Sequence, residues 1–286
     1  MKSDDLFETF QAGSSKDRMG RVVAIANQKG GVGKTTTAVN LGASLAAAER
    51  SVLVIDMDPQ ANASSGLGYP RGEVDIGVYQ ALTGEVEMQE AVRSTDLERL
   101  HVVPSTEDLA GAGIELVDVE DRENRLRRSM VSIRNRYDHI LVDCPPSLGL
   151  LTVNSLVAAD SVLVPLQCEY YAMEGLGRLM GTIERVRAAF NPDLCLEGIL
   201  LCMYDQRMNL TKQVADEVRQ HFSSYIYETV IPRNVRLGES PSFGKPVILY
   251  DINSKGSQSY LKLAREYLER SSSGMQRTGT LESRVD

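Results

Sequence analysis

Glycines, lysines and threonines gather in one short stretch of the sequence, Lys29-Gly30-Gly31-Val32-Gly33-Lys34-Thr35-Thr36. The stretch follows an apolar run, 22–26, and precedes an Ala-, Leu- and Val-rich segment, 37–48, with helical spacing. A glycine-rich turn between a strand and a helix directs backbone N–H groups and the positive end of the helix into one concavity. Lys34 would reach the β- and γ-phosphates there, and the Thr35 hydroxyl would sit on Mg²⁺. The stretch therefore predicts a phosphate-binding loop formed by all eight residues.

This loop departs from the common pattern G-x-x-x-x-G-K-[ST] at its first position. Gln28 replaces the first glycine, and a second lysine, Lys29, follows it. The alternative is a glycine-rich turn that binds no ligand. Three glycines, two lysines and two threonines between a strand and a helix argue against that alternative. We therefore expect a variant nucleotide loop.

Aspartates follow two further apolar runs. The second run leads into Asp56 and Asp58. Residues at i and i+2 of a strand end point the same way, so both carboxylates are expected to face the phosphates, with Asp58 orienting the attacking water or the metal shell. Asp143 ends another run and would hold Mg²⁺ through water opposite Thr35. The alternative is that the first two are loop carboxylates that cap a turn.

Short apolar runs alternate with helical patterns along most of the chain. The runs are rich in Val, Ile and Leu and mostly lack polar alternation, which favours strands covered on both faces. We expect an α/β fold, a mostly parallel twisted sheet with helices on both faces, whose ligand site lies at the carboxyl ends of the strands. The expected strands are 21–27, 52–57, 100–104, 139–143, 161–165, 197–203 and 227–231. The expected helices are 35–49, 108–117, 122–136, 150–158, 173–190, 210–221 and 257–270.

The pattern predicts one P-loop domain, 21–270, because no linker divides it. The flanking stretches, 1–20 and 271–286, are polar and mixed in charge, and we expect both to be disordered tails. No signal sequence or membrane-length apolar run is apparent, so a cytoplasmic location is expected.

The composition limits the classes of function. The formal net charge of −8 excludes a protein coated with basic groups, so any nucleic-acid surface must be a confined patch. Four cysteines are scattered without C-x-x-C spacing, which indicates neither a zinc site nor a disulfide framework.

Five stretches together resemble the ParA/Soj family of chromosome and plasmid partitioning ATPases, which have a deviant Walker A loop. The resemblance covers about residues 21 to 268. Three of the stretches are shared by the wider superfamily, and the last two distinguish the ParA/Soj branch. The five stretches are 29–36, 56–60, 141–147, 165–176 and 231–244.

The resemblance implies an ATP- and Mg²⁺-dependent homodimer in which Lys29 crosses to the phosphates of the partner. Two lysines in one phosphate site repel each other unless negative charge develops there to attract the second one. If Lys29 acts instead on the nucleotide of the other copy, hydrolysis becomes coupled to dimerisation, as it is with an arginine finger. The alternative is a solvated loop lysine. The resemblance also implies nonspecific binding of double-stranded DNA, stimulation by a ParB-type centromere-binding partner, and association with the nucleoid.

Further site residues are carried over from the family pattern. Pro232 and Asn234 would contact adenine, with Met203 nearby, and ATP is expected because no guanine-reading N-K-x-D motif is present. Arg207 and Arg236 would contact DNA. The alternatives are that Pro232 ends a strand and that the arginines are solvated loop residues.

Other functions of the same superfamily fit the sequence less well. A MinD-like division regulator that cycles on the membrane would end in a basic amphipathic helix, whereas 271–286 has few apolar residues and two glycines. An iron–sulfur reductase would need paired cysteines at a dimer axis, and a ligase a substrate signature that is not found. The arginine-rich stretch 122–136 is interleaved with acidic residues, which favours a solvated helix over a DNA surface.

Overall fold

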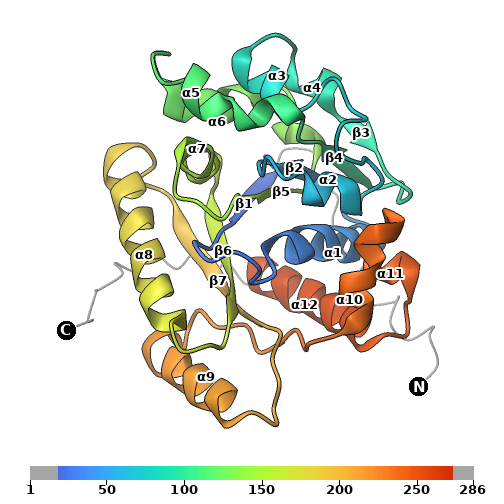
Figure 1. Cartoon of the computed structure of the whole chain (residues 1–286), viewed down its shortest axis with the longest axis vertical. Helices are drawn as coiled ribbons and strands as arrows, with labels where there is room; N and C mark the ends of the chain where they lie inside the picture. Colours follow the sequence, from blue (N-terminus) through green and yellow to red (C-terminus); the bar gives the residue numbers. More distant parts are fainter. Residues whose placement is uncertain (1–18, 273–286) are drawn as a thin grey trace.

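The computed structural model describes residues 19–272, and its centre is a seven-stranded sheet (Figure 1). The strand order is β3-β4-β2-β5-β1-β6-β7, and every neighbouring pair is parallel except β3 with β4. The expected mostly parallel sheet is thereby confirmed. The strands are β1 (Arg21–Ile25), β2 (Val52–Asp56), β3 (Arg93–Ser94), β4 (Leu100–Val103), β5 (His139–Asp143), β6 (Ser161–Gln167) and β7 (Cys195–Cys202).

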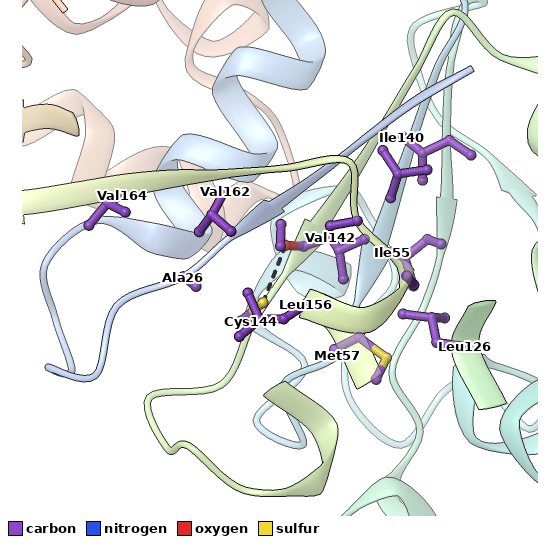
Figure 2. Close-up of a cluster of buried hydrophobic side chains, with 14 of the residues drawn as sticks. Ala26, Ile55, Met57, Leu126, Ile140, Val142, Cys144, Leu156, Val162 and Val164 are labelled. Carbon is purple, nitrogen blue, oxygen red and sulfur yellow. Dashed lines mark hydrogen bonds between the residues drawn. The ribbon is translucent and has the colours of Figure 1, made fainter. Parts of the chain in front are cut away.

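Helices cover both faces of this sheet because its strands are apolar on both sides. On β1, Val22 and Ala24 belong to one buried cluster and Val23 and Ile25 to the other. Figure 2 shows part of the first cluster, in which side chains of β2, β5 and β6 lie with Leu126 of α6 and Leu156 of α7. The α-helices of the described chain are α1 (Lys34–Ala47), α2 (Asn62–Gly66), α3 (Val78–Thr83), α4 (Met88–Ala91), α5 (Ala112–Glu115), α6 (Arg125–Ser129), α7 (Leu150–Ala158), α8 (Ala172–Ala189), α9 (Asn209–Phe222), α10 (Val235–Glu239), α11 (Val247–Tyr250) and α12 (Lys255–Ser272).

The expected strand 227–231 is wrong. This segment runs beside β7, but it forms only isolated bridges at Ile226 and Pro232. The reason is that the carboxylate of Glu266 on α12 accepts the N–H groups of Glu228 and Thr229, at 2.8 and 2.9 Å. Backbone donors that a regular strand would present to a neighbour are taken by a side chain.

The expected helices 108–117 and 122–136 are broken into short turns. The first becomes a 3₁₀ turn, Glu107–Ala110, followed by α5. The second contains α6 between two 3₁₀ turns, Arg122–Asn124 and Arg134–Arg136. Its end departs from the helix because the Arg134 carbonyl accepts the N–H of Gly20 at the entrance to β1. The long expected helices 35–49, 173–190, 210–221 and 257–270 are confirmed as α1, α8, α9 and α12.

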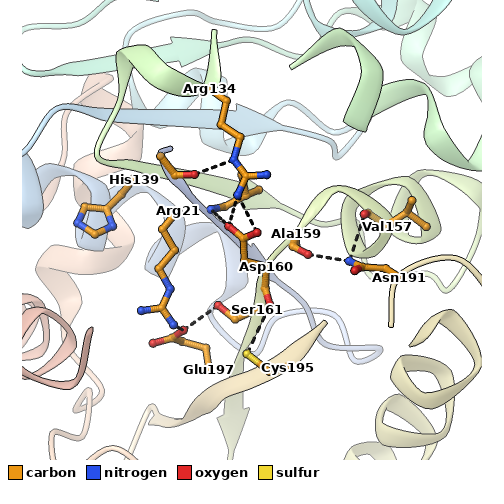
Figure 3. Close-up of polar contacts among 12 residues, drawn as sticks. Arg21, Arg134, His139, Val157, Ala159, Asp160, Ser161, Asn191, Cys195 and Glu197 are labelled. Carbon is orange, nitrogen blue, oxygen red and sulfur yellow. Dashed lines mark hydrogen bonds and ion pairs between the residues drawn. The ribbon is translucent and has the colours of Figure 1, made fainter. Parts of the chain in front are cut away.

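Polar side chains tie the amino edge of the sheet together (Figure 3). Arg21 pairs with the buried Glu197 on β7, which also accepts a hydrogen bond from Ser161 at 2.7 Å. Arg134 reaches both oxygens of Asp160, at 2.7 and 2.6 Å. These groups fix the first strand to its neighbours at the edge opposite the glycine-rich loop. Most of the two expected tails lies outside the described residues. Of the part that is described, Gly20 is buried and donates to the carbonyl of Arg134, and α12 continues through Ser272.

Candidate functional site

The glycine-rich loop joins β1 to α1 at the carboxyl edge of the sheet. Gly31 and Gly33 have φ of +72° and +99°, which L side chains rarely adopt, and a Cβ on Gly33 would lie 3.4 Å from the Sγ of Cys202. Val32 is buried, and the carbonyl of Thr36 accepts a hydrogen bond from Asn40 at 2.8 Å. Gly33 therefore lies against the end of β7. In contrast, a Cβ on Gly30 would meet only Pro146, at 3.9 Å.

The two lysines of the loop occupy different surroundings. Lys34 begins α1 and is buried, and its Nζ donates to the carbonyl of Lys29 at 3.1 Å. Burial lowers the pKa of Lys34, and the negative charge of Asp143 opposes that shift. The side chain of Lys29 is about half exposed and forms an ion pair with Glu169, in the loop after β6. The sequence reasoning did not single out Glu169, although it lies within the family-like stretch 165–176.

Asp56 is held by neighbouring groups of its own chain, and the expectation that Asp56 and Asp58 both face the phosphates stays a prediction. Asp56 is fully buried, and one of its oxygens accepts the N–H and the hydroxyl of Ser64, at 2.8 and 2.6 Å. Its other oxygen accepts the N–H of Asp58 at 3.1 Å. Burial raises the pKa of Asp56 to about 6, and the hydrogen bonds from Ser64 oppose the shift. Asp56 is thus an anchor for the turn that presents Asp58. Asp58 in turn accepts the N–H of Gln60 at 3.0 Å.

Asp143 is a buried carboxylate that lacks hydrogen-bonding partners of normal geometry. It ends β5 beside Asp56 and opposite Ile25 of β1, and it is fully buried. Neither of its oxygens has a hydrogen-bonding partner of normal geometry. Burial raises its pKa well above the usual range and the charge of Asp56 adds to this, while the Thr35 hydroxyl and Lys34 oppose the shift.

A buried carboxylate without partners is costly, and a divalent cation with its water shell is a group that would satisfy it. Mg²⁺ is usually bound through one or two carboxylates together with substrate phosphates. Within residues 19–272 no cluster of three or more acidic, His or Cys side chains could hold a metal ion alone. Thr35 and Asp143 therefore fit a magnesium ion that arrives with a nucleotide.

The residues expected near adenine lie where the segment after Ile226 meets the end of β7. Pro232 forms a bridge with Tyr204, whose N–H donates to Ile231 at 3.0 Å. Met203 has a positive φ of 49°, an uncommon backbone conformation for a side-chain-bearing residue. The side-chain oxygen of Asn234 caps α10 by accepting the N–H of Arg236 at 3.0 Å.

The two arginines expected to contact DNA are exposed but already paired. Arg207 contacts both oxygens of Asp205, at 2.9 and 2.7 Å, and this contact lowers the pKa of Asp205 to about 2. Arg236 lies 2.8 Å from Glu239 and 3.2 Å from Asp251. Any polyanion must compete with these carboxylates. In the stretch 122–136, three arginines are likewise paired with acidic side chains: Arg122 with Glu123, Arg128 with Asp121 and Arg134 with Asp160.

A doubly covered parallel sheet, a glycine-rich loop after β1 and aspartates after β2 and β5 define the class of P-loop nucleoside triphosphatases with a deviant Walker A loop. Residues 20–196 match the family model described as an AAA domain. The chain is 57% identical over 252 residues to the chromosome partitioning protein ParA of Myxococcus xanthus, which covers 88% of this chain and 89% of the relative. It is 54% identical to the sporulation initiation inhibitor protein Soj of Bacillus subtilis, over 87% and 98% of the two chains. The chain belongs to the ParA/Soj family of chromosome partitioning ATPases.

Solved structures agree with this fold. Cobyrinic acid a,c-diamide synthase from Mycobacterium smegmatis, with bound ADP and magnesium, has a TM-score of 0.77 at 38% identity, over 90% of this chain and 98% of that one. The cell division ATPase MinD of Pyrococcus furiosus has a TM-score of 0.73 at 27% identity, over 88% and 99%. The ParA of Caulobacter vibrioides, also named a chromosome partitioning protein, is 55% identical over 87% of this chain and 94% of the relative. Among the described helices, none combines the length and apolarity needed to cross a bilayer.

Proposed function

We propose that this protein binds ATP with Mg²⁺ at the carboxyl edge of its sheet and hydrolyses it to drive DNA partitioning. The observation that carries the proposal is the unpartnered, buried Asp143 beside the loop that bears Lys34 and Thr35. The ParA and Soj names of the relatives support the partitioning role.

The residues of the chain divide the work at this site. The backbone N–H groups of 30–36 cradle the phosphates, and the Lys34 ammonium neutralises their charge. Thr35 and, through water, Asp143 would hold Mg²⁺, which would neutralise charge on the phosphates. Asp58, presented by the turn that Asp56 anchors, orients the attacking water. Pro232 and Asn234 contact the adenine.

The active species in this proposal is a homodimer formed on ATP. Lys29 leaves Glu169 and reaches the phosphates of the other copy, where it meets charge that develops during hydrolysis. A side chain at Gly30 would fit within one protomer, so any effect of Gly30→Val on dimerisation reports on the other copy. Residues 21–270 form the ATPase domain, and 1–20 and 271–286 flank it.

The dimer then binds double-stranded DNA without sequence preference, associates with the nucleoid, and is stimulated by a ParB-type partner. A protein of net charge −8 can bind DNA only through a local strip of basic residues. Joining two copies doubles a small basic patch and with it the number of DNA phosphates that are neutralised. Arg207 and Arg236 belong to that strip. No module that reads base edges is recognisable in the sequence.

The test is light scattering of the full chain with and without ATP, followed by DNA binding. The wild-type protein should be a monomer that dimerises with ATP and then binds DNA, and Lys34→Ala should lose nucleotide binding measured by calorimetry. Lys29→Ala should bind nucleotide but stay monomeric.

Arg207→Ala with Arg236→Ala should weaken DNA binding equally across sequences and flatten the salt dependence by about one unit per lost phosphate contact. ATP-dependent binding to anionic vesicles in place of DNA would favour the MinD-like alternative and overturn the proposal.

A further inference from the structure

The first strand leaves the sheet at Asn27. The last regular hydrogen bond from β1 to β6 runs from the N–H of Ala26 to the carbonyl of Leu163, at 3.1 Å. In a parallel pair the next bond of this series would come from the N–H of Gln28 to the carbonyl of Pro165. The Nδ2 of Asn27 donates to that carbonyl instead, at 2.7 Å. A side chain therefore completes the ladder at the point where the backbone turns away into the phosphate loop.

The same side chain also holds the backbone of Lys29. The Oδ1 of Asn27 accepts the N–H of Lys29 at 3.0 Å, while the carbonyl of Lys29 accepts from Lys34 at 3.1 Å. Of these two contacts, the one from Asn27 joins Lys29 to the sheet and does not depend on the Lys34 ammonium. Asn27 is 4% exposed, so water does not replace its hydrogen bonds readily.

We propose that Asn27 is a positioning residue that aims Lys29. It sets the angle at which the loop leaves β1, and it thereby directs the Lys29 side chain, which in this structure meets Glu169 just beyond β6. This inference rests on the proposed function, in which Lys29 acts on the other copy. Asn27 does not touch the phosphates and acts through Lys29.

The chemistry explains why an amide is required here. The position needs one donor, for the carbonyl of Pro165, and one acceptor, for the N–H of Lys29, on a short planar group. An aspartate keeps the acceptor but sets a carboxylate against the carbonyl of Pro165. An alanine removes both bonds and leaves the buried carbonyl without a partner.

The experiment compares Asn27→Ala and Asn27→Asp with Lys29→Ala in the full chain. Calorimetry measures ATP affinity of the monomer, light scattering measures the ATP-dependent dimerisation constant, and steady-state assays measure kcat and KM. Both Asn27 variants should bind ATP within about threefold of wild type, weaken dimerisation at least tenfold, and lower kcat with little change in KM. This is the profile expected of Lys29→Ala at smaller amplitude.

A matched control is Asn191→Ala. Asn191 is also buried and donates to three carbonyls, those of Leu156, Val157 and Ala159, but it lies on the connection between α8 and β7, at the opposite edge from the loop (Figure 3). It should lower thermal stability and leave kcat per folded molecule unchanged.

Two results separate the possible failures. If Lys29→Ala dimerises like wild type, the proposed function fails. If Lys29→Ala is monomeric while the Asn27 variants dimerise normally, or lose ATP affinity as much as dimerisation, the positioning role of Asn27 is overturned. Asn27→Asp keeps the test informative if the alanine variant does not fold.

Discussion

Three aspartates at one edge of the sheet differ in the hydrogen bonds that their carboxylates accept. Asp56 accepts hydrogen bonds from Ser64 and from the N–H of Asp58, whereas neither oxygen of Asp143 has a hydrogen-bonding partner of normal geometry. The residue types alone do not distinguish these cases, because each aspartate follows an apolar strand. The difference comes from α2, a five-residue helix that the sequence did not predict and that delivers Ser64 to Asp56.

We expect Asp56→Ala and Asp58→Ala to have opposite profiles. Removing Asp56 leaves the buried hydroxyl and N–H of Ser64 without their acceptor, so the free energy of unfolding should fall by about 2–4 kcal/mol. Asp58→Ala should change it by about 1 kcal/mol or less, yet trap the ATP-bound dimer because water is no longer oriented. Urea unfolding and single-turnover hydrolysis measure the two effects. A normal turnover rate for Asp58→Ala would remove Asp58 from the mechanism.

A second residue-scale prediction concerns His139, which is buried at the start of β5. Burial lowers its pKa to about 4, and the positive charges of Arg21 and Arg50 act in the same direction while Asp138 opposes it. In the unfolded chain the histidine has a pKa near 6.5, so between about pH 6.5 and pH 4 it is protonated there while it stays neutral in the folded chain. Stability should therefore fall as the pH drops from about 6.5 to about 4, by up to about 3 kcal/mol, and this contribution should level off below that.

The check is the unfolding free energy as a function of pH for His139→Gln. The variant should lose this part of the slope, whereas His221→Gln, at an exposed position on α9, should keep it. An unchanged slope in His139→Gln would show that other groups carry the acid sensitivity.

At the scale of elements, α2 packs against the 3₁₀ turn Ser240–Phe243 that follows α10. Two glycines meet nearby, because a Cβ on Gly244 would lie 3.1 Å from the Cα of Gly68. Gly244 also has a φ of +63°. Asp56 and Ser64 stand on one side of this contact, and Arg236 stands on the other. The turn that we propose for hydrolysis and the segment that we propose for DNA contact are thus joined by this packing of α2 against the 3₁₀ turn.

Gly244→Ala should destabilise the protein by about 1–3 kcal/mol, because it adds strain at positive φ and crowds another backbone. Gly238→Ala is the matched control. Gly238 lies within α10 with no atom within 4 Å of an added Cβ, so alanine there should be neutral or stabilise by up to about 1 kcal/mol. Thermal unfolding compares the two. Equal effects would mean that the Gly68 contact carries no constraint.

The elements that were predictable from sequence are those whose pattern is local. The six parallel strands and the long helices have continuous apolar runs or clear helical spacing, and their positions are confirmed within a few residues. Segment 227–231 looks like a strand, yet Glu266, distant in sequence, takes its backbone donors. The two-residue β3 and the short helices α2, α10 and α11 carry too few residues for any period to show. In the site, the loop lysines and aspartates were recognisable, whereas Glu169 and Ser64 depend on tertiary contacts.

At the scale of the whole molecule, the net charge says less about DNA binding than the ion pairs that the basic residues already form. The net charge is −8, and both candidate DNA arginines are bound to carboxylates of the same chain. In the proposed complex with DNA, phosphates would therefore have to replace Asp205, Glu239 and Asp251 as partners of these arginines. Salt weakens both kinds of pairing.

We expect Asp205→Asn to tighten DNA binding of the ATP-bound protein. The substitution frees Arg207 from its bidentate partner and removes one negative charge beside the proposed strip. The slope of log affinity against log salt should steepen by up to about one unit. Asp216→Asn is the control, because it changes net charge equally and releases Arg219 on α9. Equal tightening in both variants would indicate a general charge effect and place the DNA surface elsewhere.

The place of β1 in the sheet has a consequence for the order in which the protein becomes functional during synthesis. β1 is translated first, but it lies between β5 and β6, whose residues emerge from the ribosome more than a hundred positions later. Pairing across such separations is slow to form, and Asn27 finds its partner only when Pro165 is available. A nascent chain that stops before β6 thus carries the complete glycine-rich motif without the framework that shapes it. We therefore expect the ability to hold a nucleotide to arise only after β6 has been synthesised.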